Sequence, residues 1–141
     1  MSNKFNTLFL NSYLELDKVC CLKFGVVTGG VTEYINRLIN ARFAPDRDEV
    51  LPRLVRYRNI RNRMAHEAGA LTDIDEINKS DLRWIDNFKK DISKKKDPIS
   101  VYLRKARKYA RRRRALKYFI IALIIILLLA AAGVGAYFLL F

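Results

Sequence analysis

The sequence predicts an all-α fold, in which a bundle of four helices is followed by a basic amphipathic helix and a single transmembrane helix. Three observations lead to this prediction. Apolar residues recur at steps of three and four in four successive segments of residues 1–93. No segment shows the sustained alternation of apolar and polar residues that is typical of a half-buried strand. The last 24 residues form an apolar run without a charged residue.

The first two helices are separated by glycines. The first is predicted from Phe5 to Phe24, where apolar side chains recur at helical spacing. Gly25 breaks this pattern, and Thr28-Gly29-Gly30 can form a turn and a helix cap. The second helix is predicted from Val31 to about Phe43.

The third helix is predicted over about residues 48–67, after a break at Pro45. Its apolar stripe includes Leu54, and Asp46 or Asp48 is well placed to cap its first turn. Gly69 and the following Thr72-Asp73 pair are expected to end it.

The fourth helix is predicted from Ile74 to Ile92, by the same apolar spacing. Asp97-Pro98 then has the pattern of a cap followed by proline in the first helical turn. A narrow apolar stripe among basic residues continues from there, which predicts a basic amphipathic helix.

Charge divides the chain into three parts. Residues 1–93 hold 15 Lys and Arg against 13 Asp and Glu, whereas residues 94–117 hold 12 against 1, and residues 118–141 hold none. We therefore predict a helical bundle over 1–93, a basic juxtamembrane segment over 94–117 and a transmembrane helix over 118–141. A bundle this small has a marginal core, which an oligomer would help to stabilise.

The apolar segment 118–141 is long enough to span a membrane. About 20 helical residues suffice to cross the hydrocarbon core of a bilayer. A buried helix that is apolar on all sides would need a much larger domain around it. Because the basic residues precede the segment, the positive-inside tendency places residues 1–117 in the cytoplasm. We expect a single-pass, C-terminally anchored membrane protein.

The basic segment before this span favours contact with anionic lipid. Each basic residue near an anionic leaflet contributes about 1 kcal/mol to membrane binding. The residues expected at the membrane surface are Arg111, Arg112, Arg113, Arg114 and Lys117. Nucleic-acid binding by the same stretch is the weaker alternative, and the two can coexist.

Metal and cofactor chemistry has little support in the sequence. Cys20 and Cys21 are adjacent on a predicted helix, where they point about 100° apart, a poor geometry for a disulfide. Two cysteines and one histidine do not make a metal site. We predict no metal and no cofactor.

The third helix carries an unusual arginine. On a helical wheel, Arg61 falls inside the apolar stripe, whereas Arg53, Arg56 and Arg63 fall where solvent is expected. A guanidinium in a core must be paired, or must face an interface or a cleft. Asn62 and His66, the only histidine, share one edge of the same helix.

The segment "RNRMAH", from Arg61 to His66, resembles the R-N-x-x-x-H signature of the HEPN superfamily. HEPN domains are similar to residues 5–93 in size, in being all-α bundles and in carrying the signature late in a long helix. The resemblance implies a HEPN-like bundle. Many members are metal-independent endoribonucleases that dimerise so that two copies of the motif face one cleft.

The resemblance also implies roles for individual residues. His66 would be the acid/base acting on the ribose 2′-OH, Arg61 would stabilise the scissile phosphate, and Asn62 would orient the two. Arg53, Arg56 and Arg63 could bind flanking phosphates of RNA. Glu67, which follows His66, could pair with the imidazole or repel substrate.

Two alternatives stay open at this stage. Some HEPN domains do not cleave RNA, so the chain could be a non-catalytic module that binds RNA or a protein partner at the membrane face. Its activity could also reside in residues 98–141, as in a small membrane-active protein. A toxin or anti-phage defence role would suit the family, but no residue establishes one.

Overall fold

The computed structural model describes residues 2–66 and 77–140, in which the regular secondary structure is helical and no strand is present. The prediction of an all-α fold is confirmed. The helices are α1 (Ser2–Phe24), α2 (Gly30–Asn40), α3 (Arg47–His66), α5 (Lys79–Ser93) and α6 (Pro98–Leu140). The expected helix end at Gly69, Thr72 and Asp73, the helix start at Ile74, and Glu67 lie outside the described residues. The second helix ends at Asn40 rather than near Phe43. Helix α5 begins at Lys79, after the predicted helical residue Ile77, because Asn78 caps it.

The chain forms two compact units, Met1–Leu103 and Arg104–Phe141. The first unit contains the helical bundle and extends beyond the boundary predicted at residue 93, because Asp97 and Ile99 are buried in it. We call this unit the head. The predicted amphipathic helix and the apolar segment form one continuous helix, α6.

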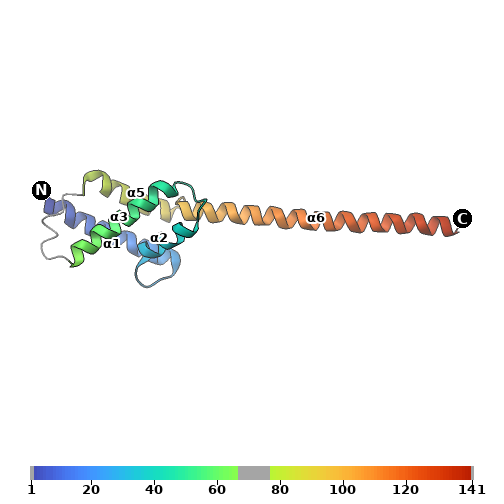
Figure 1. Cartoon of the computed structure of the whole chain (residues 1–141), viewed down its shortest axis with the longest axis horizontal. Coiled ribbons are helices and arrows are strands. Elements are labelled where there is room, and N and C mark those ends of the chain that lie inside the picture. The colour runs from blue at the N-terminus through green and yellow to red at the C-terminus, as the bar shows by residue number, and fades with distance from the viewer. Residues whose placement is uncertain (1, 67–76, 141) are drawn as a thin grey trace. The chain divides into compact units, whose positions relative to one another are not determined.

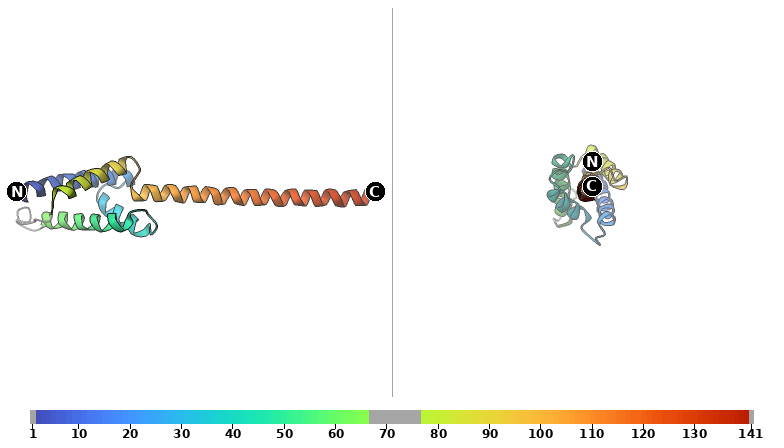
Figure 2. Two further views of the ribbon diagram at one scale, coloured as in Figure 1. Left: turned by 90° about the horizontal axis from the view of Figure 1, so that it is seen from above. Right: turned by 90° about the vertical axis from the view of Figure 1, so that its right-hand side faces the viewer.

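Within the head, α1 packs against both α2 and α5, and α2 packs against α3. Lys89 of α5 forms an ion pair with Glu15 of α1. Asp97, which follows α5 in the chain, forms an ion pair with Lys23, which follows Glu15 in α1. Helices α1 and α5 therefore run in the same direction, whereas α3 runs opposite to α1 (Figures 1 and 2).

Aromatic rings connect the four helices through the centre of the head. Tyr57 of α3 contacts Phe9 of α1 at a centroid distance of 5.7 Å and Trp84 of α5 at 5.6 Å. Trp84 stacks on Phe88, which in turn meets Tyr34 of α2 edge-on at 5.3 Å. Such ring pairs add about 0.5–1.5 kcal/mol each beyond the burial of their apolar area.

Several helices begin or end at capping residues, prolines or glycines that the sequence analysis identified. Gly25 ends α1 with φ of 69°, a left-handed conformation that suits glycine. Asp97 caps α6 by accepting the N–H of Ser100, and Pro98 is the first residue of that helix, as predicted. Of the two aspartates proposed as caps of α3, Asp46 directly precedes the helix and Asp48 lies in its first turn.

The cap of α2 comes from another helix. Gly29 makes no side-chain cap hydrogen bond. Instead, the carboxylate of Asp17 in α1 accepts the N–H of Val31 at 2.8 Å. The predicted turn at Thr28-Gly29-Gly30 is present, but the hydrogen-bond acceptor is supplied by tertiary packing.

We expect Gly30→Ala to destabilise the head by about 3 kcal/mol, at the upper end of the usual cost of overpacking. A Cβ at Gly30 would lie 2.3 Å from the carbonyl oxygen of Asp17 and 2.4 Å from the backbone N of Cys21, so α1 and α2 would have to separate. Thermal unfolding monitored by Trp84 fluorescence measures the loss. Gly29→Ala, with nothing within 4 Å of its Cβ, should cost only the strain of its positive φ, about 1 kcal/mol. Equal stability of the Gly30→Ala variant and the wild type would contradict this close helix packing.

Candidate functional site

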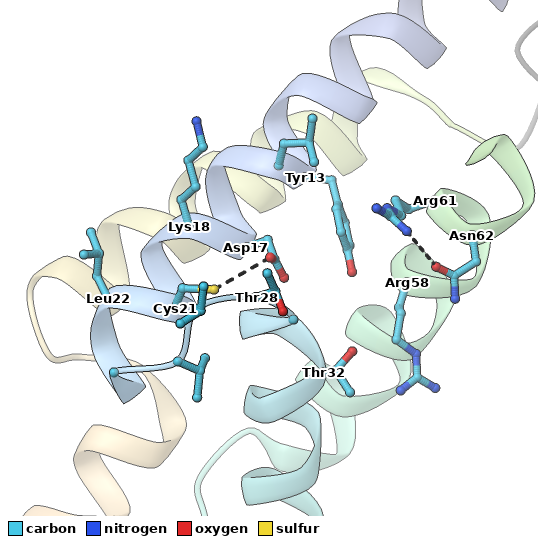
Figure 3. A pocket seen from close by; sticks show the side chains of 15 residues that line it. Tyr13, Asp17, Lys18, Cys21, Leu22, Thr28, Thr32, Arg58, Arg61 and Asn62 are labelled. Atoms are coloured by element: carbon cyan, nitrogen blue, oxygen red, sulfur yellow. Dashed lines mark hydrogen bonds between the residues drawn. The ribbon is translucent and has the colours of Figure 1, made fainter. Parts of the chain in front are cut away.

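A solvent-open cavity of about 800 Å³ lies between α1, the α1–α2 loop, α2 and α3 (Figure 3). Its polar lining includes Tyr13 and Asp17 from α1, Thr32 from α2, and Arg61 and Asn62 from α3. The structure therefore brings two of the three predicted catalytic residues to one cavity.

Arg61 lies at the edge of the apolar stripe rather than in the core. The buried face of α3 consists of Val50, Leu54, Tyr57, Ile60 and Met64. Arg61 is half-buried and turns toward α1, where its Nη1 donates to the amide oxygen of Asn62 at 3.3 Å. Among the described residues, no carboxylate lies within ion-pair distance of Arg61. Its guanidinium is thus available to an anion entering the cavity.

Arg58 was missed in the sequence analysis and also lines this cavity. It precedes Arg61 by three residues and Asn62 by four, so the three side chains share one face of α3. Figure 3 shows Arg61 and Asn62 opposite Tyr13, with Arg58 one turn away along α3. Helical spacing from Arg61 was the signal that could have identified Arg58.

Tyr13 and Asp17 form the α1 side of the cavity. Burial, reinforced by the nearby Asp17 carboxylate, raises the pKa of Tyr13 to about 12, although Arg61 and Arg58 oppose the shift. The hydroxyl therefore keeps its proton at neutral pH. The carboxylate of Asp17 accepts the N–H of Val31 and, in the described part of the chain, forms no ion pair with Arg58 or Arg61. No sequence signal indicated that these two residues face α3.

His66 does not line the cavity. It is the last residue of α3 and is exposed, one turn beyond Asn62 on the same edge of the helix. The structure of a single chain thus places Arg61 and Asn62 together and leaves His66 beside them at the helix end.

A family model described as a family of unknown function (DUF6548) matches residues 7–119. The chain belongs to this family. No curated protein and no solved structure matches the chain. The DUF6548 match includes all the cavity-lining residues and ends just inside the apolar part of α6, so the head and the basic segment are both features of the family's region.

Two of the predicted RNA-binding arginines of this DUF6548 domain contact α5. Arg56 forms an ion pair with Asp81 at 3.1 Å, and the hydroxyl of Tyr57 donates to the same carboxylate at 2.8 Å. Arg53 lies over the ring of Trp84, 5.5 Å from its centroid. Arg56 and Arg53 therefore help to hold α3 against α5, on the opposite edge of α3 from Arg58. Arg63 is half-buried.

The basic residues of the DUF6548 chain that were assigned to the membrane surface lie in the second compact unit. Arg111–Arg114 and Lys117 are all exposed on α6. The apolar stretch that follows makes α6 the one helix in the described part of the chain that is long and apolar enough to cross a membrane.

The cysteines of the head are both free. Cys20 is buried, and burial raises the pKa of its thiol to about 12, so that its reactive thiolate is scarce at neutral pH. Cys21 is half-buried, and its Sγ lies 3.8 Å from Oδ2 of Asp17.

Proposed function

We propose that this DUF6548 chain is a membrane-tethered, HEPN-type endoribonuclease that acts as a homodimer and needs no metal. One observation carries the proposal: Arg61 and Asn62 share an open cavity without a carboxylate neutralising Arg61 among the described residues, and the exposed His66 follows one turn later. Among the described residues, no ion pair is formed by Arg61, Asn62 or His66, which supports a role in binding RNA.

The chemistry of RNA cleavage matches these side chains. Attack by the ribose 2′-OH needs a base for that proton and an acid for the leaving 5′-oxygen, and imidazole can fill either role near neutral pH. The phosphorane formed during attack is anionic, and Arg61 can bind two of its oxygens at once. Asn62, which accepts a hydrogen bond from Arg61, would hold the guanidinium in place.

A dimer supplies what one chain lacks. The sequence holds a single histidine, and one imidazole cannot act as base and acid in the same step. Two-fold symmetry would bring the α3 edges of two chains together, so that one shared cleft contains both copies of His66. RNA would then lie against Arg58 as well as Arg61.

The second part of the proposal places the head at the cytoplasmic face of a membrane. Residues 118–141 would span the bilayer, and the positive-inside tendency would keep the basic segment 94–117 in the cytoplasm. There Arg111–Arg114 and Lys117, exposed on α6, would contact anionic lipid headgroups.

The test is RNA breakdown by the full chain in detergent or nanodiscs, with EDTA present. His66→Ala should lower the cleavage rate at least about 100-fold, the usual contribution of general acid–base catalysis. Arg61→Ala should cause a loss of similar size, because the developing charge is no longer stabilised. Arg83→Ala, which removes an exposed arginine of α5, is the matched control and should cleave normally.

Two outcomes would overturn the enzyme proposal. One is an equal cleavage rate in the wild type and the His66→Ala variant, and the other is the absence of cleavage by either. A strictly monomeric protein in mass measurements of the purified chain would remove the shared site.

A non-catalytic module is the second candidate, favoured by the absence of His66 from the cavity that contains Arg61 and Asn62. Such a module would bind RNA or a protein partner at the membrane face. It predicts that His66→Ala leaves RNA binding intact in a filter-binding assay, whereas Arg58→Glu abolishes it.

A further inference from the structure

Part of the rim of the cavity is apolar. An apolar rim is not needed to bind the phosphates of RNA. Leu14, Leu22 and Val27 line the cavity and are 42%, 85% and 96% exposed. Large aliphatic side chains that gather around a cavity, next to a few polar groups, are typical of sites for small molecules. The volume of about 800 Å³ lies within the usual range for such sites.

The opposite wall of the cavity is positively charged. Arg58 and Arg61 line it from α3, and neither forms an ion pair within the described part of the chain. Asp17 is the one acidic residue among those that line the cavity, and its carboxylate already accepts the N–H of Val31. Three cations, Arg58, Arg61 and Lys18, line the cavity against this one carboxylate, so an excess of positive charge is left for a ligand.

Neutral hydrogen-bonding groups lie between the two walls. Thr28 and Thr32 contribute hydroxyls, Tyr13 contributes its phenol and Asn62 its amide. Figure 3 shows Tyr13, Asp17 and Thr28 on the side of the cavity that faces Arg61. The cavity thus has a cationic wall, a polar floor and an aliphatic rim.

We propose that this cavity binds an organic phosphate, a phosphate ester that carries an apolar group. Arg58 and Arg61 would hold the phosphate, since guanidinium groups bind its oxygens bidentately. A phosphate monoester has between one and two negative charges at neutral pH, which two arginines can match. The apolar group would lie against Leu14, Leu22 and Val27.

This inference goes beyond the proposed ribonuclease activity and does not require it, because His66 is not part of the cavity. The same chemistry has two sources, a nucleotide and a phospholipid with its acyl chains. Both contain a phosphate ester and a part that can pack on aliphatic side chains, which is the base of the nucleotide or the acyl chains of the lipid. Direct binding measurements distinguish them.

The experiment uses the full chain in nanodiscs of neutral lipid and titrates three probes by calorimetry: inorganic phosphate, adenosine 5′-monophosphate and soluble dihexanoyl phosphatidic acid. At least one ester should bind 10-fold or more tightly than inorganic phosphate, and the tighter ester identifies the source. Equal affinity for all three probes, or no binding of either ester, would overturn the proposal.

Two variants test the two walls separately. Arg58→Ala should weaken binding of the preferred ester at least 10-fold, and Val27→Ser should weaken it about 3- to 10-fold while leaving inorganic phosphate unaffected. The controls are Arg83→Ala and Phe43→Ser, which change exposed residues that do not line the cavity. Wild-type affinity in the Arg58→Ala variant would contradict the assignment.

We expect the affinity for the ester to be independent of catalysis. His66→Ala should bind the ester as tightly as the wild type does, whether or not the wild type cleaves RNA. Loss of ester binding in this variant would show that the ligand lies at the end of α3 instead, and would refute the cavity as the site.

Discussion

Removing residues 118–141 is expected to transfer the protein from the membrane fraction to the soluble fraction. The removed segment contains fifteen Leu, Ile, Val and Phe residues. Each favours insertion at the centre of a membrane helix by about 0.3–0.6 kcal/mol, so together they contribute about 5–9 kcal/mol. The shortened chain would keep only the electrostatic attraction of its basic segment, which salt screens.

Fractionation of cells that express the full and shortened chains measures this effect, with alkaline carbonate extraction to remove peripheral proteins. A full-length chain with Ile124→Lys and Ile125→Lys should behave like the shortened one, because each charge near the bilayer centre costs about 2.5–3.5 kcal/mol. Gly133→Leu is the control and should stay in the membrane. If the shortened chain resists carbonate extraction, the apolar segment is not the anchor.

Replacing Asp97 by Ala is expected to destabilise the head by about 3–5 kcal/mol, the usual cost of removing one partner of a buried ion pair. The Asp97 side chain is fully buried, and that of Lys23, which donates to it at 3.0 Å, is only 16% exposed. The Tyr34 hydroxyl donates to the other carboxylate oxygen at 2.7 Å. Burial, with Asp97 adding to it, raises the pKa of Tyr34, so this donor stays protonated.

Without the carboxylate, the ammonium of Lys23 and the hydroxyl of Tyr34 would lose their shared acceptor, and α6 would lose its cap. Trp84, the only tryptophan, reports unfolding of the head in a urea titration. Asp91→Ala, an exposed aspartate of α5, is the control. If Asp97→Ala does not fold, Lys23→Met with Asp97→Leu should recover a folded head, since it removes both charges. A loss below about 1 kcal/mol for Asp97→Ala would show that the network contributes little to stability.

Burial of Asp97 explains why the predicted domain boundary differs from that of the compact unit. Asp97-Pro98 was identified correctly as a helix start, because capping depends on residues close together in the chain. The carboxylate of Asp97 also accepts hydrogen bonds from Lys23 and Tyr34, which lie more than 60 positions away in the sequence. Neighbouring residues could not predict this second role. The first turns of α6 consequently belong to the head.

The candidate site was predictable only in part. Arg61 and Asn62 were placed near each other by helical geometry, and they do share a cavity. Arg53 and Arg56 were assigned to solvent and RNA, and their side chains are 42% and 44% exposed, but Trp84 and Asp81 of α5 also lie against them. Arg58 was overlooked because a helical wheel gives angles around one helix and not the surfaces that surround it.

The sequence by itself determined the all-α class, the positions of most helix ends and the apolar, charge-free end of the chain. These properties depend on periodicity, capping residues and composition, which act over a few neighbouring residues. Only the tertiary structure decided that α1 and the α1–α2 loop leave a cavity beside Arg58 and Arg61, and that Asp17 caps α2. Both depend on which helix faces are brought together by packing, and packing is the sum of contacts between residues far apart in the chain.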